Sequence, residues 1–121
     1  MFFNLLIKSF ANAFRGIGYT FRHEVSFRIQ IVFAIVVLIG AFYLPLRTLE
    51  RVVIILLVAM VLILELANSV LERVVDLFQP KIDYIAKAVK DIMAAAVFVA
   101  ALASVVVGLI IFVPYLKFLI K

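Results

Sequence analysis

The hydrophobic and polar positions of the chain divide it into one amphipathic segment and three long apolar segments. Residues 1–22 repeat large apolar side chains every three or four positions, with polar and basic side chains on the opposite face. This period is typical of an amphipathic helix lying in a membrane interface. Segments 29–46, 52–71 and 92–116 are long and apolar enough to cross a bilayer. The pattern therefore predicts a surface helix followed by three transmembrane helices.

The composition supports a membrane protein. The 121 residues are 69% hydrophobic and 16% charged, whereas soluble domains are closer to half apolar and a quarter charged. Cysteine is absent, which excludes disulfides and thiolate metal sites. We therefore expect one all-α integral membrane domain over residues 1–121.

Basic residues are unevenly divided between the two sides that three spans would create. Eight of the 12 Lys and Arg residues lie on the side of the N-terminal helix and the second polar loop, and four lie on the other side. Because cytoplasmic segments carry the excess of basic residues, this distribution places the N-terminal helix at the cytoplasmic face.

Polar side chains interrupt the second span near its end. Glu65 follows the unbroken apolar run 52–64, and Asn68, Glu72 and Asp76 share its helix face at three- and four-residue steps. An ionisable group at membrane depth is costly and marks a candidate functional site. Each of these residues alone could be a boundary charge or a structural hydrogen-bonding group, but that explanation fits the whole set poorly.

The charged groups on this side suit phosphoryl transfer. Glu24 and Glu72, if the fold brings them together, suit Mg²⁺, which takes one or two carboxylates and completes its shell with water and phosphate. Glu65 suits a general base for a lipid hydroxyl. The basic side chains that could hold phosphate charge are Lys8, Arg15, Arg28 and Lys90.

Several other kinds of site are not supported by the residues. The chain has no P-loop motif, and its single histidine, His23, argues against a His-based zinc site or a Ser-His dyad. Three classes stay open at this point: an interfacial metal-dependent enzyme, a small transporter or proton-relay subunit that uses Glu65, and a structural membrane subunit. The transporter would be independent of nucleotide, and in a structural subunit Glu65→Gln would be silent.

The second span ends in a motif that resembles the signature of a known family. The motif reads Glu65-Leu-Ala-Asn68-Ser69-Val-Leu-Glu72-Arg-Val-Val-Asp76. It resembles the signature of the bacterial integral-membrane diacylglycerol kinase and undecaprenol kinase family. Segments 14–28 and 88–95 resemble the family's N-terminal and Ala-Lys-Asp elements. The three blocks occur in the family's order and cover nearly the whole chain.

The resemblance implies an ATP- and Mg²⁺-dependent kinase that phosphorylates the hydroxyl of diacylglycerol or undecaprenol. It also implies a homotrimer with active sites shared between subunits, at the cytoplasmic face of the bacterial inner membrane. Glu65 would be the general base, and Glu24 and Glu72 would bind the metal. The residues that the resemblance assigns to ATP are Asn12, Glu24, Asn68, Glu72, Asp76, Asp83, Lys90 and Asp91. Those expected to meet phosphate or a lipid headgroup are Lys8, Arg15, Arg28 and Ser69.

The chain departs from the family pattern at several positions. Asn12 stands where the family has an aromatic ATP contact, and Leu5 where it has a basic one. The nucleotide contacts of the first helix therefore carry over less directly than the catalytic carboxylates. Segments 14–17 and 108–114 look more like the undecaprenol kinase branch, but both lipids stay open as substrates.

Overall fold

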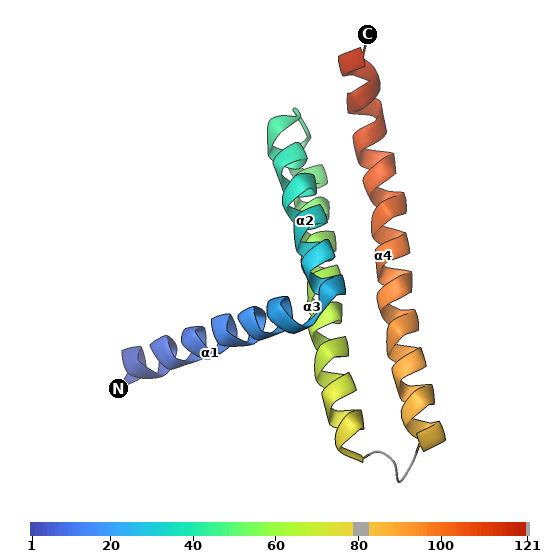
Figure 1. The fold of residues 1–121 in the computed structure, drawn as a ribbon. Helices are drawn as coiled ribbons and strands as arrows, with labels where there is room; N and C mark the ends of the chain where they lie inside the picture. Colours follow the sequence, from blue (N-terminus) through green and yellow to red (C-terminus); the bar gives the residue numbers. More distant parts are fainter. Residues whose placement is uncertain (79–82, 121) are drawn as a thin grey trace.

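The computed structural model describes residues 1–78 and 83–120, which form four helices (Figure 1). The helices are α1 (Phe2–His23), α2 (Val25–Tyr43), α3 (Thr48–Phe78) and α4 (Asp83–Ile120). The described residues contain no strand. Helices α2, α3 and α4 are each long and apolar enough to cross a membrane. The predicted class, an all-helical membrane protein with three spans after a first helix, is confirmed.

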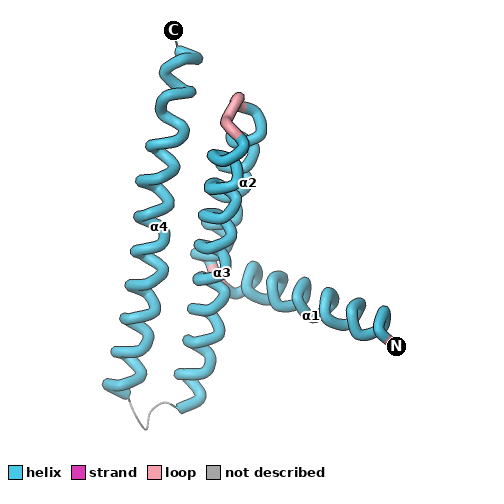
Figure 2. The backbone as a smooth tube through the Cα atoms, turned by 180° about the vertical axis from the view of Figure 1, so that it is seen from behind, coloured by secondary structure: helices cyan, strands magenta, loops and turns pink. Residues whose placement is uncertain are grey.

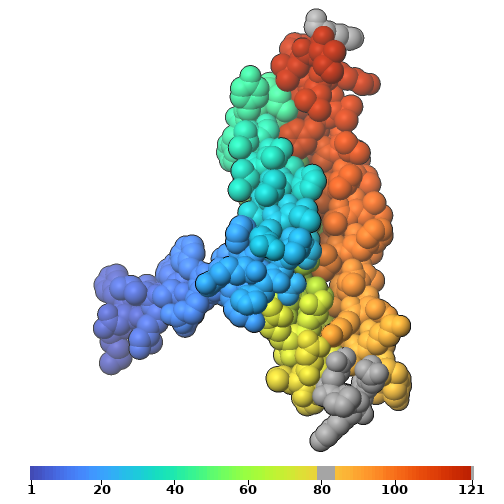
Figure 3. Space-filling view, in the orientation of Figure 1, coloured from blue at the N-terminus to red at the C-terminus, as the bar shows by residue number. Residues whose placement is uncertain are grey.

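Helices α2, α3 and α4 run along one another, while α1 projects sideways from them (Figures 1 and 2). The space-filling view shows α1 as an arm that leaves the bundle partway along its length (Figure 3). An amphipathic helix with this placement can lie in the membrane interface while the other three helices cross it. The N-terminus lies at the free end of this arm (Figure 1).

A single residue separates the arm from the first span. Glu24 adopts an extended conformation (φ −118°, ψ 111°), and its N–H bonds to the carbonyl of Thr20. A residue with extended dihedrals at the start of a helix is the usual N-cap geometry, and it lets the chain change direction there. Glu24 therefore occupies the elbow between α1 and α2.

The end of α2 differs from the predicted boundary. The hydropathy pattern carries the first span to residue 46, but the helix ends at Tyr43 and Leu44 is extended (φ −79°, ψ 152°). The cause is Pro45, because a proline pushes the residue before it out of the helical region. The apolar residues Leu44 and Leu46 are buried in the turn instead of extending the helix.

Helices α3 and α4 are longer than the membrane requires. Their 31 and 38 residues correspond to about 46 and 57 Å, whereas a bilayer core is about 30 Å thick. Both helices therefore extend beyond the hydrocarbon region. Helix α4 also continues through Pro114 to Ile120, which is tolerated where neighbouring helices re-satisfy the freed backbone groups.

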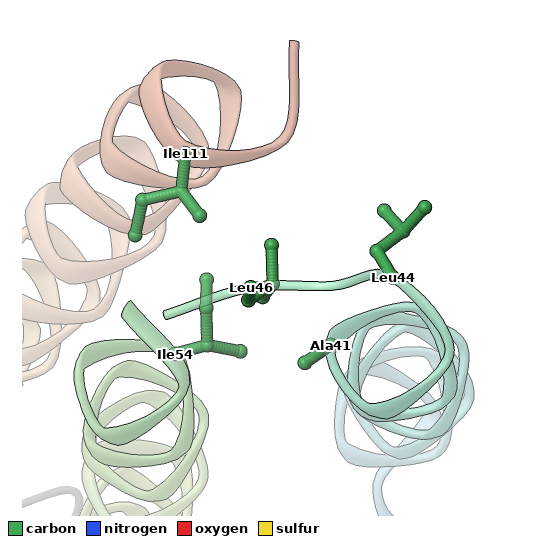
Figure 4. Packing of buried hydrophobic residues seen from close by; sticks show 5 residues of the cluster. All are labelled: Ala41, Leu44, Leu46, Ile54 and Ile111. Carbon is green, nitrogen blue, oxygen red and sulfur yellow. The ribbon is translucent and has the colours of Figure 1, made fainter. Parts of the chain in front are cut away.

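The hydrophobic core is small and lies at the end of the bundle that is distant from α1. Figure 4 shows its five buried members, Ala41, Leu44, Leu46, Ile54 and Ile111. Most other large apolar side chains are exposed on the outside of the helices. This distribution is expected of helices that face lipid or further helices instead of water.

Polar contacts secure the same end of the bundle. The guanidinium of Arg51 donates to the carbonyls of Ala41 and Leu44, at 2.9 and 3.1 Å. The hydroxyl of Tyr115 on α4 donates to the carboxylate of Glu50 on α3 at 2.5 Å. The turn after α2 is therefore tied to α3, and α3 is tied to α4, at the far end from the acidic motif.

Candidate active site

Glu65 is the most buried carboxylate of the acidic motif, with 3% of its surface exposed. It lies on α3 and faces α2. Ser26 donates a short hydrogen bond from its hydroxyl to one carboxylate oxygen, and the Gln30 amide donates to the other at 3.4 Å. Ser26 and Gln30 are one helical turn apart on α2, so both reach the same point on α3. Both oxygens of Glu65 are therefore held by side chains of α2.

Glu24 reaches α3 one turn away from Glu65. Its carboxylate accepts from the hydroxyl of Ser69 at 3.4 Å and lies 3.4 Å from the guanidinium of Arg73. Ser69 and Arg73 are four residues apart on α3, and Glu72 follows Ser69 by three residues. The elbow between α1 and α2 therefore brings Glu24 into contact with the turn of α3 that also carries Glu72, the carboxylate that the resemblance pairs with it.

The oxygen atoms near Glu72 suit a divalent cation. The Asn68 amide donates to Glu72 at 3.4 Å, while its own carbonyl oxygen is buried and has no partner among the described residues. Glu24, Glu72 and this oxygen are all hard ligands of the kind that Mg²⁺ prefers. No group of three His, Cys, Asp or Glu side chains close enough to hold a metal occurs within 1–78 and 83–120. A cation here would therefore need ligands from water or a bound phosphate in addition.

A close ion pair joins the acidic motif to α4. The ammonium of Lys90 lies 2.6 Å from the carboxylate of Asp76. Lys90 precedes the third predicted span, 92–116, and its hydrogen bond to Asp76 raises the pKa of the ammonium above its ordinary value. The pair links α3 to α4 and places a positive charge beside the motif.

A groove of about 410 Å³ lies between α1 and α3. Arg15 donates to the side-chain carbonyl of Asn12 at 3.1 Å along its α1 side. Arg73 on the α3 side donates to the hydroxyl of Tyr19 at 3.1 Å, and its guanidinium carbon lies 4.9 Å from the centre of that ring. Ser69 also lines the groove. The groove therefore combines two guanidinium groups with hydroxyl and amide groups.

A second, apolar cavity lies between α2, α3 and α4. Its volume is about 430 Å³, and its walls are almost entirely aliphatic and aromatic. Two polar residues line it, Gln30 and Ser104, and each has a buried side-chain oxygen without a partner among the described residues. Gln30, which lines this apolar space, also bonds to Glu65, so the side chain of Gln30 connects the cavity with the buried carboxylate.

The fold gathers most of the predicted site residues but not all of them. Side-chain contacts connect Glu24 with Ser69, Asn68 with Glu72, Asp76 with Lys90 and Asn12 with Arg15. Within the described part of the chain, the exposed side chains of Lys8, Arg28 and Asp91 form no hydrogen bond or ion pair. The side chain of Asp83 lies outside the described part.

Four residues of the site were not predicted from the sequence: Ser26, Gln30, Tyr19 and Arg73. Gln30 carried a usable signal, because it is the one strongly polar side chain in an apolar span and such residues are seldom placed there without a role. Arg73 lies inside the family-like motif, but its charge resembles that of an ordinary headgroup anchor. Ser26 and Tyr19 gave no distinguishing signal.

The fold and the site together define a class of protein. Three helices that are long and apolar enough to cross a membrane carry a buried carboxylate whose partner Gln30 lines an apolar cavity, and further carboxylates, an amide and guanidinium groups lie toward one end of the bundle. Such a combination is typical of a membrane protein that handles a polar reaction at the interface.

Comparison with known proteins identifies the family. The family model described as prokaryotic diacylglycerol kinase matches residues 11–112. The chain is 42% identical over 113 residues to the undecaprenol kinase of Bacillus subtilis (strain 168), covering 93% of this chain and 92% of that one. It is 39% identical over 112 residues to a diacylglycerol kinase of a Synechocystis species, covering 92% and 63%. It is 29% identical over 104 residues to the diacylglycerol kinase of Escherichia coli (strain K12), covering 86% and 85%.

The chain belongs to the prokaryotic diacylglycerol kinase family, and it is a membrane lipid kinase.

Proposed function

We propose that this lipid kinase transfers the γ-phosphoryl group of ATP to the hydroxyl of a membrane lipid, with Glu65 as the general base. The observation that carries the proposal is the environment of Glu65, which is buried and held by two donors, one of which, Gln30, lines an apolar cavity. A lipid can enter that environment from the bilayer, while the phosphate donor arrives from the water on the other side of the motif.

The reaction takes place at the lipid hydroxyl. Its oxygen attacks the γ-phosphorus, a new O–P bond forms, and the bond between that phosphorus and the bridging oxygen of ADP breaks. The hydroxyl proton passes to the carboxylate of Glu65. The bonds from Ser26 and Gln30 fix the direction of that carboxylate, which matters because a base must lie within hydrogen-bonding reach of the proton that it accepts.

The nucleotide end of the site lies between the elbow and the acidic motif. Glu24 and Glu72, with the side-chain oxygen of Asn68 that has no partner among the described residues, would hold Mg²⁺, and the ion would neutralise phosphate charge during transfer. Lys90, fixed by Asp76, supplies a positive charge on the same side. The other residues proposed to contact ATP are Asn12, Asp83 and Asp91, with Lys8, Arg15, Arg28 and Ser69 toward phosphate or headgroup.

The lipid substrate is proposed to be undecaprenol or diacylglycerol. The apolar cavity beside Gln30 suits the hydrocarbon chain of either lipid. The identity to an undecaprenol kinase, 42% over 93% of the chain, favours undecaprenol as the main substrate.

The enzyme is further proposed to be a homotrimer in the bacterial inner membrane, with its active sites shared between subunits at the cytoplasmic face. The many exposed apolar side chains of the three spans leave room for contacts between copies. The excess of basic residues on the α1 side favours the cytoplasmic orientation. Transfer from ATP added to sealed inside-out vesicles but not to right-side-out vesicles would support this orientation, and the reverse result would contradict it.

Transfer of the γ-phosphate tests the function directly. Radiolabelled Mg²⁺-ATP is mixed with the enzyme in micelles that contain either diacylglycerol or undecaprenol, and the labelled lipid is counted. Glu65→Gln should lower kcat by about 10²–10⁴-fold, the usual contribution of a general base, while leaving ATP binding intact. Glu50→Gln is the matched control, because it makes the same substitution at the distant end of α3.

Two results would contradict these assignments. Absence of transfer to both lipids by the wild-type enzyme would contradict the proposed substrates. Retention of more than about a tenth of kcat by Glu65→Gln, a loss of under about 1.4 kcal/mol, would contradict the role of Glu65 as base.

A further inference from the structure

Arg73 on α3 contacts both α1, through Tyr19, and the elbow between α1 and α2, through Glu24. Its guanidinium lies 3.4 Å from the carboxylate of Glu24, donates to the hydroxyl of Tyr19 at 3.1 Å, and packs over that ring. The side chain keeps 38% of its surface exposed and lines the groove between α1 and α3. Arg73 is therefore a partly accessible cation whose carboxylate partner is a proposed metal ligand.

The groove offers donors to an anion. Arg15 and Asn12 line it from α1, and Ser69 and Arg73 line it from α3. Guanidinium groups match the oxygens of a phosphate group in geometry and charge. A ligand that carries phosphate is therefore the chemical class that this groove fits.

Along the axis of α3, the groove lies close to Glu65, the proposed general base. Ser69 follows Glu65 by four residues on α3, and Arg73 follows Ser69 by four more. Each step of four residues advances about 6 Å along the helix, so the groove begins about one turn outward from the proposed base. If Glu65 acts on the lipid hydroxyl, which is the proposed function, a phosphoryl group joined to that hydroxyl would lie near the mouth of the groove.

We propose that this groove binds a phosphate group, and that Arg73 exchanges the carboxylate of Glu24 for that phosphate when a divalent cation takes up Glu24. The phosphate belongs either to the nucleotide or to the phosphorylated lipid.

The exchange follows from the charges around Arg73. While Arg73 is paired with Glu24, its positive charge is largely neutralised, and the groove attracts an anion mainly through Arg15. A cation bound to Glu24 repels the guanidinium and releases it toward the groove. Cation and phosphate then strengthen the binding of each other, and the coupling is reciprocal because both depend on the same arginine.

The test measures binding and needs no turnover. The full-length protein in detergent micelles is titrated with two probes at saturating Mg²⁺: a non-hydrolysable ATP analogue and a short-chain phosphatidic acid. Arg73→Gln should weaken one probe by at least tenfold. The probe affected identifies the source of the phosphate. Arg22→Gln is the matched control, since Arg22 is exposed on α1 and, among the described residues, its side chain bonds only to the carbonyl of Gly18 in its own helix.

A second measurement addresses the exchange itself. Binding of Mn²⁺ alone, counted by electron paramagnetic resonance, should tighten at least threefold in Arg73→Gln because the competitor for Glu24 has been removed. Arg73→Lys keeps the charge but loses the planar fork. It should therefore compete for Glu24 as the wild type does and weaken the affected probe by at least threefold.

Three outcomes would overturn the proposal: unchanged affinity for both probes in Arg73→Gln, unchanged or weaker Mn²⁺ binding in that variant, or an equal loss in Arg22→Gln. If Arg73→Gln loses its helix content by circular dichroism, the probe affinities of Arg73→Lys decide the question, and no loss there overturns the proposal. Wild-type phosphate transfer is measured separately. Intact transfer with silent Arg73 variants would reject the groove alone and leave the proposed function standing.

Discussion

The hydroxyl of Ser26 is one of two donors to the buried carboxylate of Glu65, so Ser26→Ala tests how that carboxylate is held. The substitution removes one oxygen atom and leaves the helix-forming tendency of α2 unharmed, because alanine is the best helix former. The remaining donor, Gln30, lies 3.4 Å from Glu65. That distance is longer than the usual N–H···O range of about 2.7–3.2 Å, so Gln30 compensates poorly.

The expected cost follows from the type of bond that is lost. A hydrogen bond to a charged group contributes about 1.5–3 kcal/mol, and the acceptor Glu65 is 3% exposed, so water has little access to replace the lost donor. We therefore expect Ser26→Ala to lower the free energy of unfolding by about 1.5–3 kcal/mol. Because the hydroxyl also aims the proposed base, kcat should fall while the KM for ATP stays the same.

The measurement is reversible unfolding in mixed micelles with increasing sodium dodecyl sulfate, followed by circular dichroism. Ser104→Ala is the matched control, since its hydroxyl oxygen is buried and has no partner among the described residues. Loss of an unpartnered buried hydroxyl should be neutral or slightly stabilising. A double-mutant cycle with Glu65→Gln then isolates the interaction, with an expected coupling of at least about 1 kcal/mol.

Equal effects of the two serine substitutions would refute this account of Ser26. So would a cycle in which Ser26→Ala costs the same with and without the Glu65 carboxylate, because the hydroxyl would then contribute through packing alone. Ser26→Thr keeps a hydroxyl at the same position and should retain most of the stability of the wild type if the hydrogen bond is the cause.

Two further predictions concern the metal and the assembly. Glu72→Gln and Glu24→Gln should each weaken Mg²⁺-dependent ATP binding by at least about tenfold, a loss of about 1.4 kcal/mol, and calorimetry that finds both unchanged would reject them as metal ligands. Chemical crosslinking in mild detergent should saturate at three subunits, and saturation at one or two would contradict the trimer.

The helices and the acidic motif could be predicted from the sequence because both depend on neighbours along the chain. Apolar runs long enough to cross a bilayer identify the spans, and a stripe at three- and four-residue steps stays on one helix face wherever the helix is placed. The end of α2 was predicted less well. Hydropathy alone cannot distinguish buried turn residues such as Leu44 and Leu46 from the last turn of a span.

The contacts that complete the site were harder to predict because they cross between helices. Whether Ser26 faces Glu65 depends on how α2 is rotated and how deep it lies relative to α3, and neither quantity is contained in the period of one helix. The ion pair between Arg73 and Glu24 depends in addition on the direction that the chain takes at the elbow. A charged residue near a membrane boundary gives no sign of such a partner by itself, since basic anchors are common there.

The relative depth of residues on α2 and α3 could nevertheless have been estimated by counting residues from the turn that joins the two helices. Ser26 lies 19 residues before Pro45, and Glu65 lies 20 residues after it. Two antiparallel helices joined by a short turn advance by the same distance per residue, so positions equally far from the turn reach the same depth. Glu24 and Ser69, 21 residues before and 24 after Pro45, follow the same rule to within one turn. The turn that Arg51 ties to α3 at the far end of the bundle therefore sets which residues meet at the site.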